Sequence, residues 1–190
     1  MKTGLFFGSF NPIHIGHLII ANYLMEYSDL NELWFVVTPH NPFKEKNTLL
    51  ADNQRLNMVR LAVENYPKFK VSDVEFKLSK PSYTVDTLAY LAEKFPNNKF
   101  TLILGEDNLN SLPKWKNSEF LLKNYSFIIY PRITEKVKDL NIVGNITKID
   151  APIIELSSTK IREMIKLKKN IRPMLPPEVF EYIDGSNLYQ

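Results

Sequence analysis

Two histidines, His14 and His17, lie three residues apart near the N-terminus, in the stretch FFGSFNPIHIGHLII. The apolar residues 5–7 are typical of the end of a buried strand, and turn-forming residues follow at positions 8–12. Helical apolar spacing begins at Ile15, so both histidines fall at the start of a helix. Main-chain amides there favour anions, and imidazoles can donate hydrogen bonds to phosphate oxygens. The pattern therefore favours phosphate binding.

Two other interpretations of this histidine pair stay open. An ordinary junction between a strand and a helix can carry two surface histidines with no function. A zinc site is the second alternative, because histidines at this spacing can share one helix face. Such a site needs a third ligand, however, and the only other histidine is His40. The chain contains no cysteine and no H-E-x-x-H motif, and phosphate is favoured over zinc.

Two of the six glycines in the chain also lie in this stretch. Gly8 removes a side chain where the strand turns, which would let a ligand lie against the main chain. Gly16 stands between the histidines and would clear space on the helix face that they share. We therefore expect both glycines to belong to the binding site.

Length and composition limit the class of protein. The 190 residues suit one domain with a sizeable core, and 44% of them are hydrophobic. The net charge of +3 suits an anionic small molecule and is too weak to indicate nucleic acid. The N-terminus does not resemble a signal peptide, and no apolar run approaches the ~20 residues of a membrane span. We expect no membrane partner and a cytoplasmic location.

Strands and helices are predicted to alternate along the chain. After the first strand and helix, the apolar patterns predict strands at 33–37, 69–76, 100–104, 126–130 and 153–156, and helices at 52–66, 84–95, 158–167 and 178–185. Alternation of this kind predicts an α/β fold with a mostly parallel sheet and helices on both faces. The polar stretch 39–47 is predicted to be a mobile loop.

Polar residues follow the predicted strands, where ligands bind in such sheets. They are Asn11, His14 and His17 after the first strand, Pro39, His40 and Lys44 after the second, Tyr83 and Thr84 beyond the third, Glu106 and Asp107 after the fourth, and 157–162 after the last. The chain has neither a G-x-x-x-x-G-K-[ST] loop nor a G-x-G-x-x-G fingerprint, which excludes the usual P-loop and dinucleotide sites.

Several of these stretches together resemble one enzyme family. GSFNPIHIGH (8–17) matches the H-x-G-H signature of a nucleotidyltransferase superfamily, and LSSTKIR (156–162) resembles its second signature. PHNPFK, SYTVDTL and GEDNLNSLPKW, between them, are similar to motifs of bacterial nicotinate-nucleotide adenylyltransferases. The resemblance runs from Lys2 to about Lys168. The chain departs from the usual pattern with Ser9 in place of glycine, Asn11 in place of aspartate and Leu156 in place of isoleucine or valine.

The resemblance implies a Rossmann-like nucleotidyltransferase fold in a single domain, 1–190, with a small C-terminal helical part from about residue 157. It implies transfer of the adenylyl group of ATP to nicotinate mononucleotide, forming deamido-NAD and pyrophosphate, with Mg²⁺ arriving on ATP and no protein metal site. The alternatives are an adenylyltransferase for nicotinamide mononucleotide or phosphopantetheine, a cytidylyltransferase, and a non-catalytic nucleotide-binding regulator. A homo-oligomer is left open.

The resemblance also assigns roles to residues. His14, His17 and Arg162 would act on the phosphates during catalysis. ATP would further contact Gly8, Ser9, Phe10, Gly16, Gly105, Asp107, Ser158 and Thr159, and the mononucleotide would contact Lys44, Tyr83, Thr84 and Trp115. Each has a structural alternative: residues 157–159 and Thr84 suit helix caps, Trp115 suits packing, Asp107 suits a loop or cap, and Lys44 suits the surface.

Overall fold

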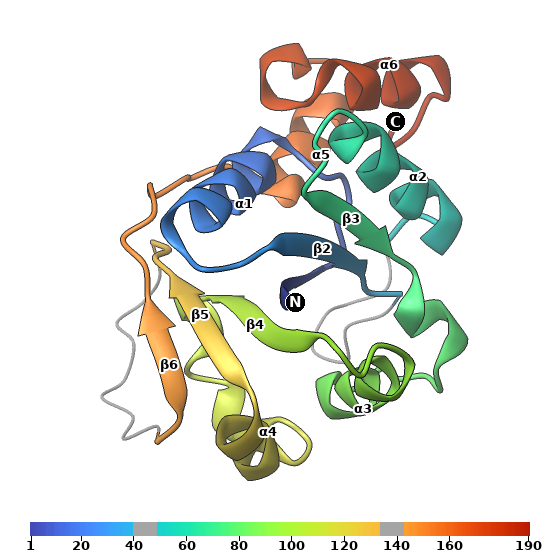
Figure 1. The fold of residues 1–190 in the computed structure, drawn as a ribbon. Helices are drawn as coiled ribbons and strands as arrows, with labels where there is room; N and C mark the ends of the chain where they lie inside the picture. Colours follow the sequence, from blue (N-terminus) through green and yellow to red (C-terminus); the bar gives the residue numbers. More distant parts are fainter. Residues whose placement is uncertain (40–48, 134–142) are drawn as a thin grey trace.

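A six-stranded parallel sheet forms the centre of the molecule (Figure 1). The computed structural model describes residues 1–39, 49–133 and 143–190. The spatial order of the strands is β3-β2-β1-β4-β5-β6, and every neighbouring pair is parallel. The strands are β1 (Lys2–Gly8), β2 (Glu32–Val37), β3 (Phe69–Ser72), β4 (Lys99–Gly105), β5 (Ser126–Tyr130) and β6 (Asn145–Lys148). This confirms the predicted α/β fold.

Helices cover both faces of the sheet, as the sequence predicts (Figure 1). They are α1 (Ile15–Tyr27), α2 (Asp52–Val63), α3 (Thr84–Lys94), α4 (Ser118–Asn124), α5 (Ser158–Lys166) and α6 (Pro177–Gly185). One core joins the sheet to α1, α2, α5 and α6, and a second joins its other face to α3 and α4. In the described part of the chain, no helix is long and apolar enough to cross a bilayer.

The register of the sheet brings several strand ends to one edge. Gly8 at the end of β1 pairs with Val37 at the end of β2, and Gly105 pairs with Tyr130 in the same way. All six residues of β2 are buried, as expected for a strand covered on both faces. The loops that follow β1, β2, β4 and β5 therefore leave from a common edge, where ligands bind in folds of this type.

The predicted last strand, 153–156, is wrong. These residues are irregular, and the sixth strand is β6, which the sequence analysis did not predict. β6 is an edge strand whose only apolar residue is Ile146, so it lacks the buried pattern that reveals the others. Ile154 instead packs on the core beneath α1. Hydrophobicity at this point serves packing against a helix and not strand pairing.

Two other element predictions need correction. The predicted strand 69–76 stops at Ser72 and continues as a 3-10 turn, η1 (Val74–Lys77), in which Glu75 is buried and accepts a hydrogen bond from the Thr87 hydroxyl at 2.9 Å. The turn places Glu75 in contact with Thr87. The apolar alternation of the sequence continues through the turn, and for this reason a longer strand was predicted. Helix α4 was not predicted, and most of the predicted mobile loop 39–47 lies outside the described residues.

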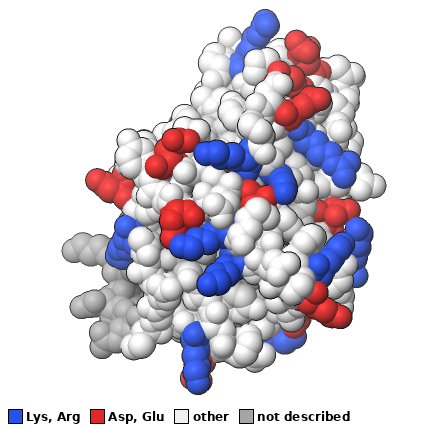
Figure 2. All heavy atoms as spheres, viewed as in Figure 1, with Lys and Arg blue, Asp and Glu red and all other residues white. Residues whose placement is uncertain are grey.

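Charged side chains are intermixed on the face seen in Figure 2, where Lys and Arg alternate with Asp and Glu. Such mixing accords with the small net charge of +3. The face shown therefore has no broad basic surface of the kind that binds a nucleic-acid backbone.

One guanidinium ties the loop ends to α2. Arg55 is fully buried, and all five of its N–H donors have acceptors. These acceptors are the carbonyl oxygens of Ser9 (2.6 Å), Thr38 (2.8 Å), Leu50 (3.1 Å) and Pro39 (3.2 Å) and the Asp52 carboxylate (2.7 Å). Burial lowers the pKa of Arg55, and the ion pair with Asp52 opposes that shift. Arg55 thus joins the loop after β1 to the loop after β2.

Replacing Arg55 with lysine should destabilise the fold. An ammonium group has three donors and a different shape, so Arg55→Lys leaves buried carbonyl oxygens without partners. We expect a loss of about 2–4 kcal/mol in the free energy of unfolding, measured by urea denaturation. The exposed Arg60 of the same helix is the matched control, and Arg60→Lys should change stability by less than about 0.5 kcal/mol. Equal stability of the two variants would contradict the proposed role of Arg55.

Candidate active site

The two histidine rings lie against each other at the start of α1, with their planes tilted by 35°. His14 is the N-cap residue, and its ring centroid lies 3.8 Å from that of His17. The main-chain N–H of His14 donates a hydrogen bond to Nδ1 of His17 at 3.2 Å. Because Nδ1 is the acceptor, a neutral His17 carries its proton on Nε2. Local main-chain geometry therefore makes Nε2–H the hydrogen-bond donor of His17.

His14 is buried in a way that removes its charge. Its side chain is 4% exposed, and burial lowers its pKa to about 3, with a smaller contribution from the positive charge of Arg132. His14 is therefore neutral near pH 7. Its Nδ1 atom has no hydrogen-bond partner among the described residues. A buried ring nitrogen in this condition is a candidate contact for a substrate atom.

Gly8 and Gly16 are needed for close packing. A Cβ atom at Gly16 would lie 2.9 Å from Ile154 and 3.0 Å from Nδ1 of His14, so this glycine makes room for the His14 ring. A Cβ atom at Gly8 would lie 2.8 Å from the Phe10 ring. Phe10 fills the space that we expected a ligand to use beside Gly8. Its side chain is 2% exposed and belongs to the core, so Phe10 presents only main-chain atoms to a ligand.

The two signature motifs meet in space. The Ser158 hydroxyl donates to the carbonyl oxygen of Pro12 at 2.8 Å, and Nη1 of Arg162 donates to that of Asn11 at 2.8 Å. Nη2 of Arg162 also reaches the Thr159 hydroxyl at 3.3 Å. Residues about 150 positions apart in the sequence are thus joined directly at the loop between β1 and α1 (residues 9–14), which we call the histidine loop. The Ser158 hydroxyl proton is used in this contact, which leaves its main-chain N–H to face a phosphate.

Ser157 caps α5, in agreement with the structural alternative for this segment. Its side-chain oxygen accepts a hydrogen bond from the main-chain N–H of Lys160 at 3.2 Å. The amides of Ser158 and Thr159 occupy the first turn, where the main chain offers no internal acceptor. The positive end of the helix dipole lies at the same point. This end of α5 can therefore stabilise an anion beside the histidine pair.

Asn11 is a buried acceptor at the position where the resemblance led us to expect aspartate. It is 3% exposed, and its Oδ1 atom accepts hydrogen bonds from the Tyr189 hydroxyl at 2.8 Å and the main-chain N–H of Leu50 at 3.3 Å. Burial raises the pKa of Tyr189, so its hydroxyl stays protonated and donates. The chain end therefore helps to fix the histidine loop. Sequence analysis missed Tyr189, since nothing in its neighbours indicates this contact.

A second group of predicted residues lies at the start of α3. Tyr83, not Thr84, is the N-cap residue, so the interpretation of Thr84 as a cap is wrong. Thr84 is the first residue of the helix, and its side chain is partly exposed. Trp115 is half-buried, packs against the core beneath α3 and α4, and donates from Nε1 to the Ser111 hydroxyl at 3.4 Å. The assignment of these residues to the mononucleotide stays a prediction.

Gly105 and Asp107 follow β4 at the common edge of the sheet. Asp107 is exposed, and its Oδ1 accepts a hydrogen bond from the Asn108 side chain at 3.1 Å, which suits the loop interpretation. A Cβ atom at Gly105 would collide with the side chains of Asp107 and Arg132. Arg132 is a cation near His14 that sequence analysis missed, and its place just after the strand ending at Tyr130 was the available signal.

Lys44, a predicted substrate contact, and His40 lie outside the described residues. Among the described residues, no three His, Asp or Glu side chains are placed to hold a metal ion together. The zinc interpretation of His14 and His17 thus gains no third ligand from this part of the chain.

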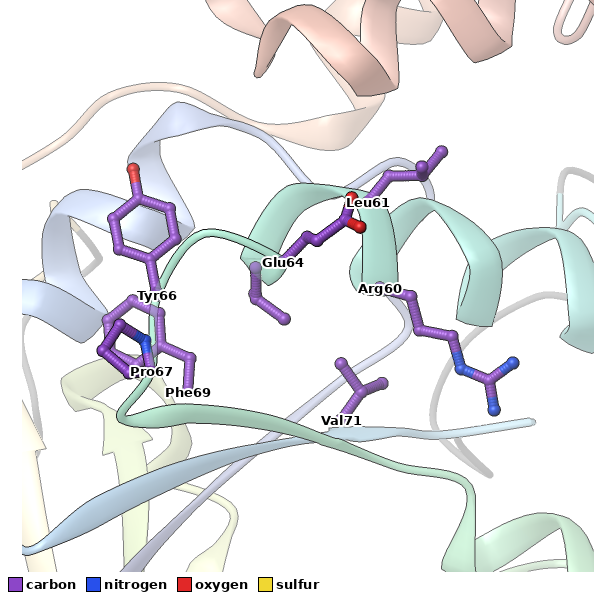
Figure 3. Close-up of a pocket in the computed structure, with 8 residues that line it drawn as sticks. Arg60, Leu61, Glu64, Tyr66, Pro67, Phe69 and Val71 are labelled. Atoms are coloured by element: carbon purple, nitrogen blue, oxygen red, sulfur yellow. The ribbon is translucent and has the colours of Figure 1, made fainter.

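The pocket in Figure 3 lies elsewhere, between α2 and β3. It is lined by Arg60, Leu61, Val63, Glu64, Tyr66, Pro67, Phe69 and Val71, none of which is a predicted site residue. Phe69 begins β3, so this pocket lies toward the amino end of that strand. The histidine pair and the other predicted site residues lie beyond the carboxyl ends of the strands, so we do not assign the reaction to this pocket.

Comparison with known proteins agrees with the geometry. The model of the cytidylyltransferase-like family matches residues 5–164. Curated proteins described as probable nicotinate-nucleotide adenylyltransferases are 60% identical in Flavobacterium psychrophilum and 57% identical in Flavobacterium johnsoniae, with full coverage of both chains in each comparison. The chain belongs to the nicotinate-nucleotide adenylyltransferase family. The family expected from the resemblance is thereby confirmed.

A solved structure shows the same fold at lower identity. The nicotinic acid mononucleotide adenylyltransferase of Plasmodium falciparum, complexed with NaAD, matches with a TM-score of 0.82 and 24% identity, over 99% of this chain and 97% of that chain. At this identity the match supports the fold alone. The Rossmann-like nucleotidyltransferase architecture expected from the motifs is confirmed.

The low pKa of His14 predicts a pH-dependent contribution to stability. Its folded-state value of about 3 lies below the value of 6.5 in an unfolded chain. The unfolded state therefore gains a proton first, so this contribution is complete above pH 6.5 and is lost as the pH falls toward 3. The difference in unfolding free energy between the parent and His14→Asn should shrink by up to about 1.4 kcal/mol per pH unit from pH 6 to 4. A constant difference would show that His14 is not held neutral.

Proposed function

We propose that this chain transfers the adenylyl group of ATP to nicotinate mononucleotide, forming deamido-NAD and pyrophosphate. The observation that carries the proposal is the direct joining of the two signature motifs, through Ser158 to Pro12 and Arg162 to Asn11, beside the histidine pair. The choice of acceptor is supported by the family membership and by the two relatives that share 60% and 57% of its sequence.

The reaction needs positioning more than proton transfer. A phosphate oxygen of the mononucleotide attacks the α-phosphorus of ATP, a new P–O bond forms, and the bond to the bridging oxygen of pyrophosphate breaks. The attacking phosphate is already anionic at pH 7, so no general base is required. Alignment of two polyanions and stabilisation of the growing charge are what the protein must supply.

The described residues are suited to these tasks. Nε2–H of His17 can donate a hydrogen bond to an oxygen of the α-phosphate. The neutral ring of His14 lies against the ring of His17. Arg162 supplies a fixed cation, and the first-turn amides of α5 can bind the β- and γ-phosphates. Mg²⁺ enters with ATP as part of the substrate, held by its phosphates. The use of ATP favours a cytoplasmic location.

The acceptor can be tested against its alternatives in one assay. Pyrophosphate release is measured with ATP and with nicotinate mononucleotide, nicotinamide mononucleotide or phosphopantetheine, and with CTP replacing ATP. We expect the highest kcat/KM for ATP with nicotinate mononucleotide. Preference for the amide would overturn the acceptor but not adenylyl transfer, and the absence of pyrophosphate with every pair would favour a non-catalytic nucleotide-binding protein.

Removing the His17 donor should reduce turnover far more than ATP binding. His17→Ala is expected to lower kcat by about 10²–10³ with KM for ATP changed only a few-fold, because the lost contact strengthens as charge builds at the α-phosphate. Steady-state kinetics with saturating mononucleotide measures both constants. Asn22→Ala, at an exposed position of the same helix, is the control and should match the parent. A rise in KM with kcat unchanged would contradict the role assigned to His17.

A further inference from the structure

An ion pair joins the first turn of α3 to the loop that precedes α4. Nζ of Lys116 lies 2.9 Å and 3.1 Å from the two carboxylate oxygens of Asp86, which is the third residue of α3. The two side chains are 45% and 40% exposed. The same ammonium lies 4.7 Å from the centroid of the Tyr83 ring, a cation–π contact. Lys116 thus lies among residues that are predicted to contact the mononucleotide, and it directly follows Trp115.

The ion pair decides the charge beside this helix end. Asp86 alone would place a negative charge next to the first-turn amides of α3 and would oppose a second anion there. Lys116 neutralises that charge while its ammonium stays on the side of the Tyr83 ring. The Ser82 hydroxyl, in a residue 8% exposed just before the N-cap, has no hydrogen-bond partner among the described residues. Because the Ser82 Oγ atom is itself buried, the charge that a ligand meets at this helix end is set by Asp86 and Lys116.

We infer that Lys116 is a specificity-determining residue, which favours the carboxylate of nicotinate mononucleotide over the neutral carboxamide by neutralising Asp86 beside the first turn of α3. This inference rests on the proposed function. The two mononucleotides differ by one negative charge at the ring substituent, so a change in local charge acts mainly on the acid. Packing of Lys116 on Tyr83 would instead affect both substrates alike.

A double-mutant cycle separates charge from packing. kcat/KM is measured for both mononucleotides with the parent, Lys116→Met, Asp86→Asn and the double variant. Lys116→Met should lower the value for the acid about 5-fold, the size expected for an exposed pair, and change that for the amide less than about 2-fold. Asp86→Asn should widen the acid preference. The double variant, with neither charge, should return to within about 2-fold of the parent preference.

A second lysine over aromatic rings of α3 provides the control. Nζ of Lys94 lies 5.7 Å from the Tyr90 and Phe95 ring centroids at the far end of the helix, so Lys94→Met makes the same change in charge and packing away from Asp86. It should leave the acid preference unchanged, and thermal unfolding of all variants checks the fold.

The possible results are distinct. Equal losses for both mononucleotides in Lys116→Met, no change for either, or a double variant that stays as impaired as Lys116→Met would each overturn the inference. A parent that adenylylates neither mononucleotide would instead overturn the proposed function, and this inference with it.

Discussion

The geometry of the candidate site depends on which groups bind the carbonyl oxygens of the histidine loop. A loop that receives a polyanion must keep these partly negative oxygens away from it. The carbonyl of Ser9 is bound by Arg55, that of Asn11 by Arg162 and that of Pro12 by Ser158. Two guanidinium groups and a hydroxyl, from α2 and α5, thus bind three carbonyl oxygens of one short loop. The contacts that fix the loop also remove a source of repulsion toward phosphate.

Within the histidine pair, His14 carries no charge near pH 7. Burial keeps His14 neutral, and the main-chain N–H of His14 fixes the tautomer of His17. Positive potential comes from the Arg162 guanidinium and from the amino ends of helices. This division suits adenylyl transfer, in which the attacking phosphate brings no proton to remove. A main-chain hydrogen bond sets which nitrogen of His17 donates, and Arg162 and the helix ends supply the electrostatic attraction.

Sequence patterns predicted the elements whose formation depends on neighbouring residues in the chain. The strands β1, β2, β4 and β5 are buried apolar runs that end near turn-forming residues, and sequence analysis found them, whereas the polar edge strand β6 has no such signal. The motifs identified His14, His17 and Arg162 by residue type and spacing. Sequence analysis missed Arg55 and Tyr189, because their contacts join segments that are 46 and 178 residues apart, respectively. The filling of the space beside Gly8 by Phe10 was also missed, although the two residues lie only two positions apart, because it depends on the Phe10 ring turning back into the core.

The substitution at position 11 shows why an unusual residue need not weaken such a site. Its side chain must accept hydrogen bonds from Tyr189 and Leu50, and the amide oxygen of Asn11 does so as a carboxylate would. The main-chain carbonyl of the same residue binds Arg162. A carboxylate here would place a negative charge next to that guanidinium and partly cancel its field. Asparagine keeps the acceptor and omits the charge, so it leaves the positive potential of Arg162 available for the phosphates that we propose it binds.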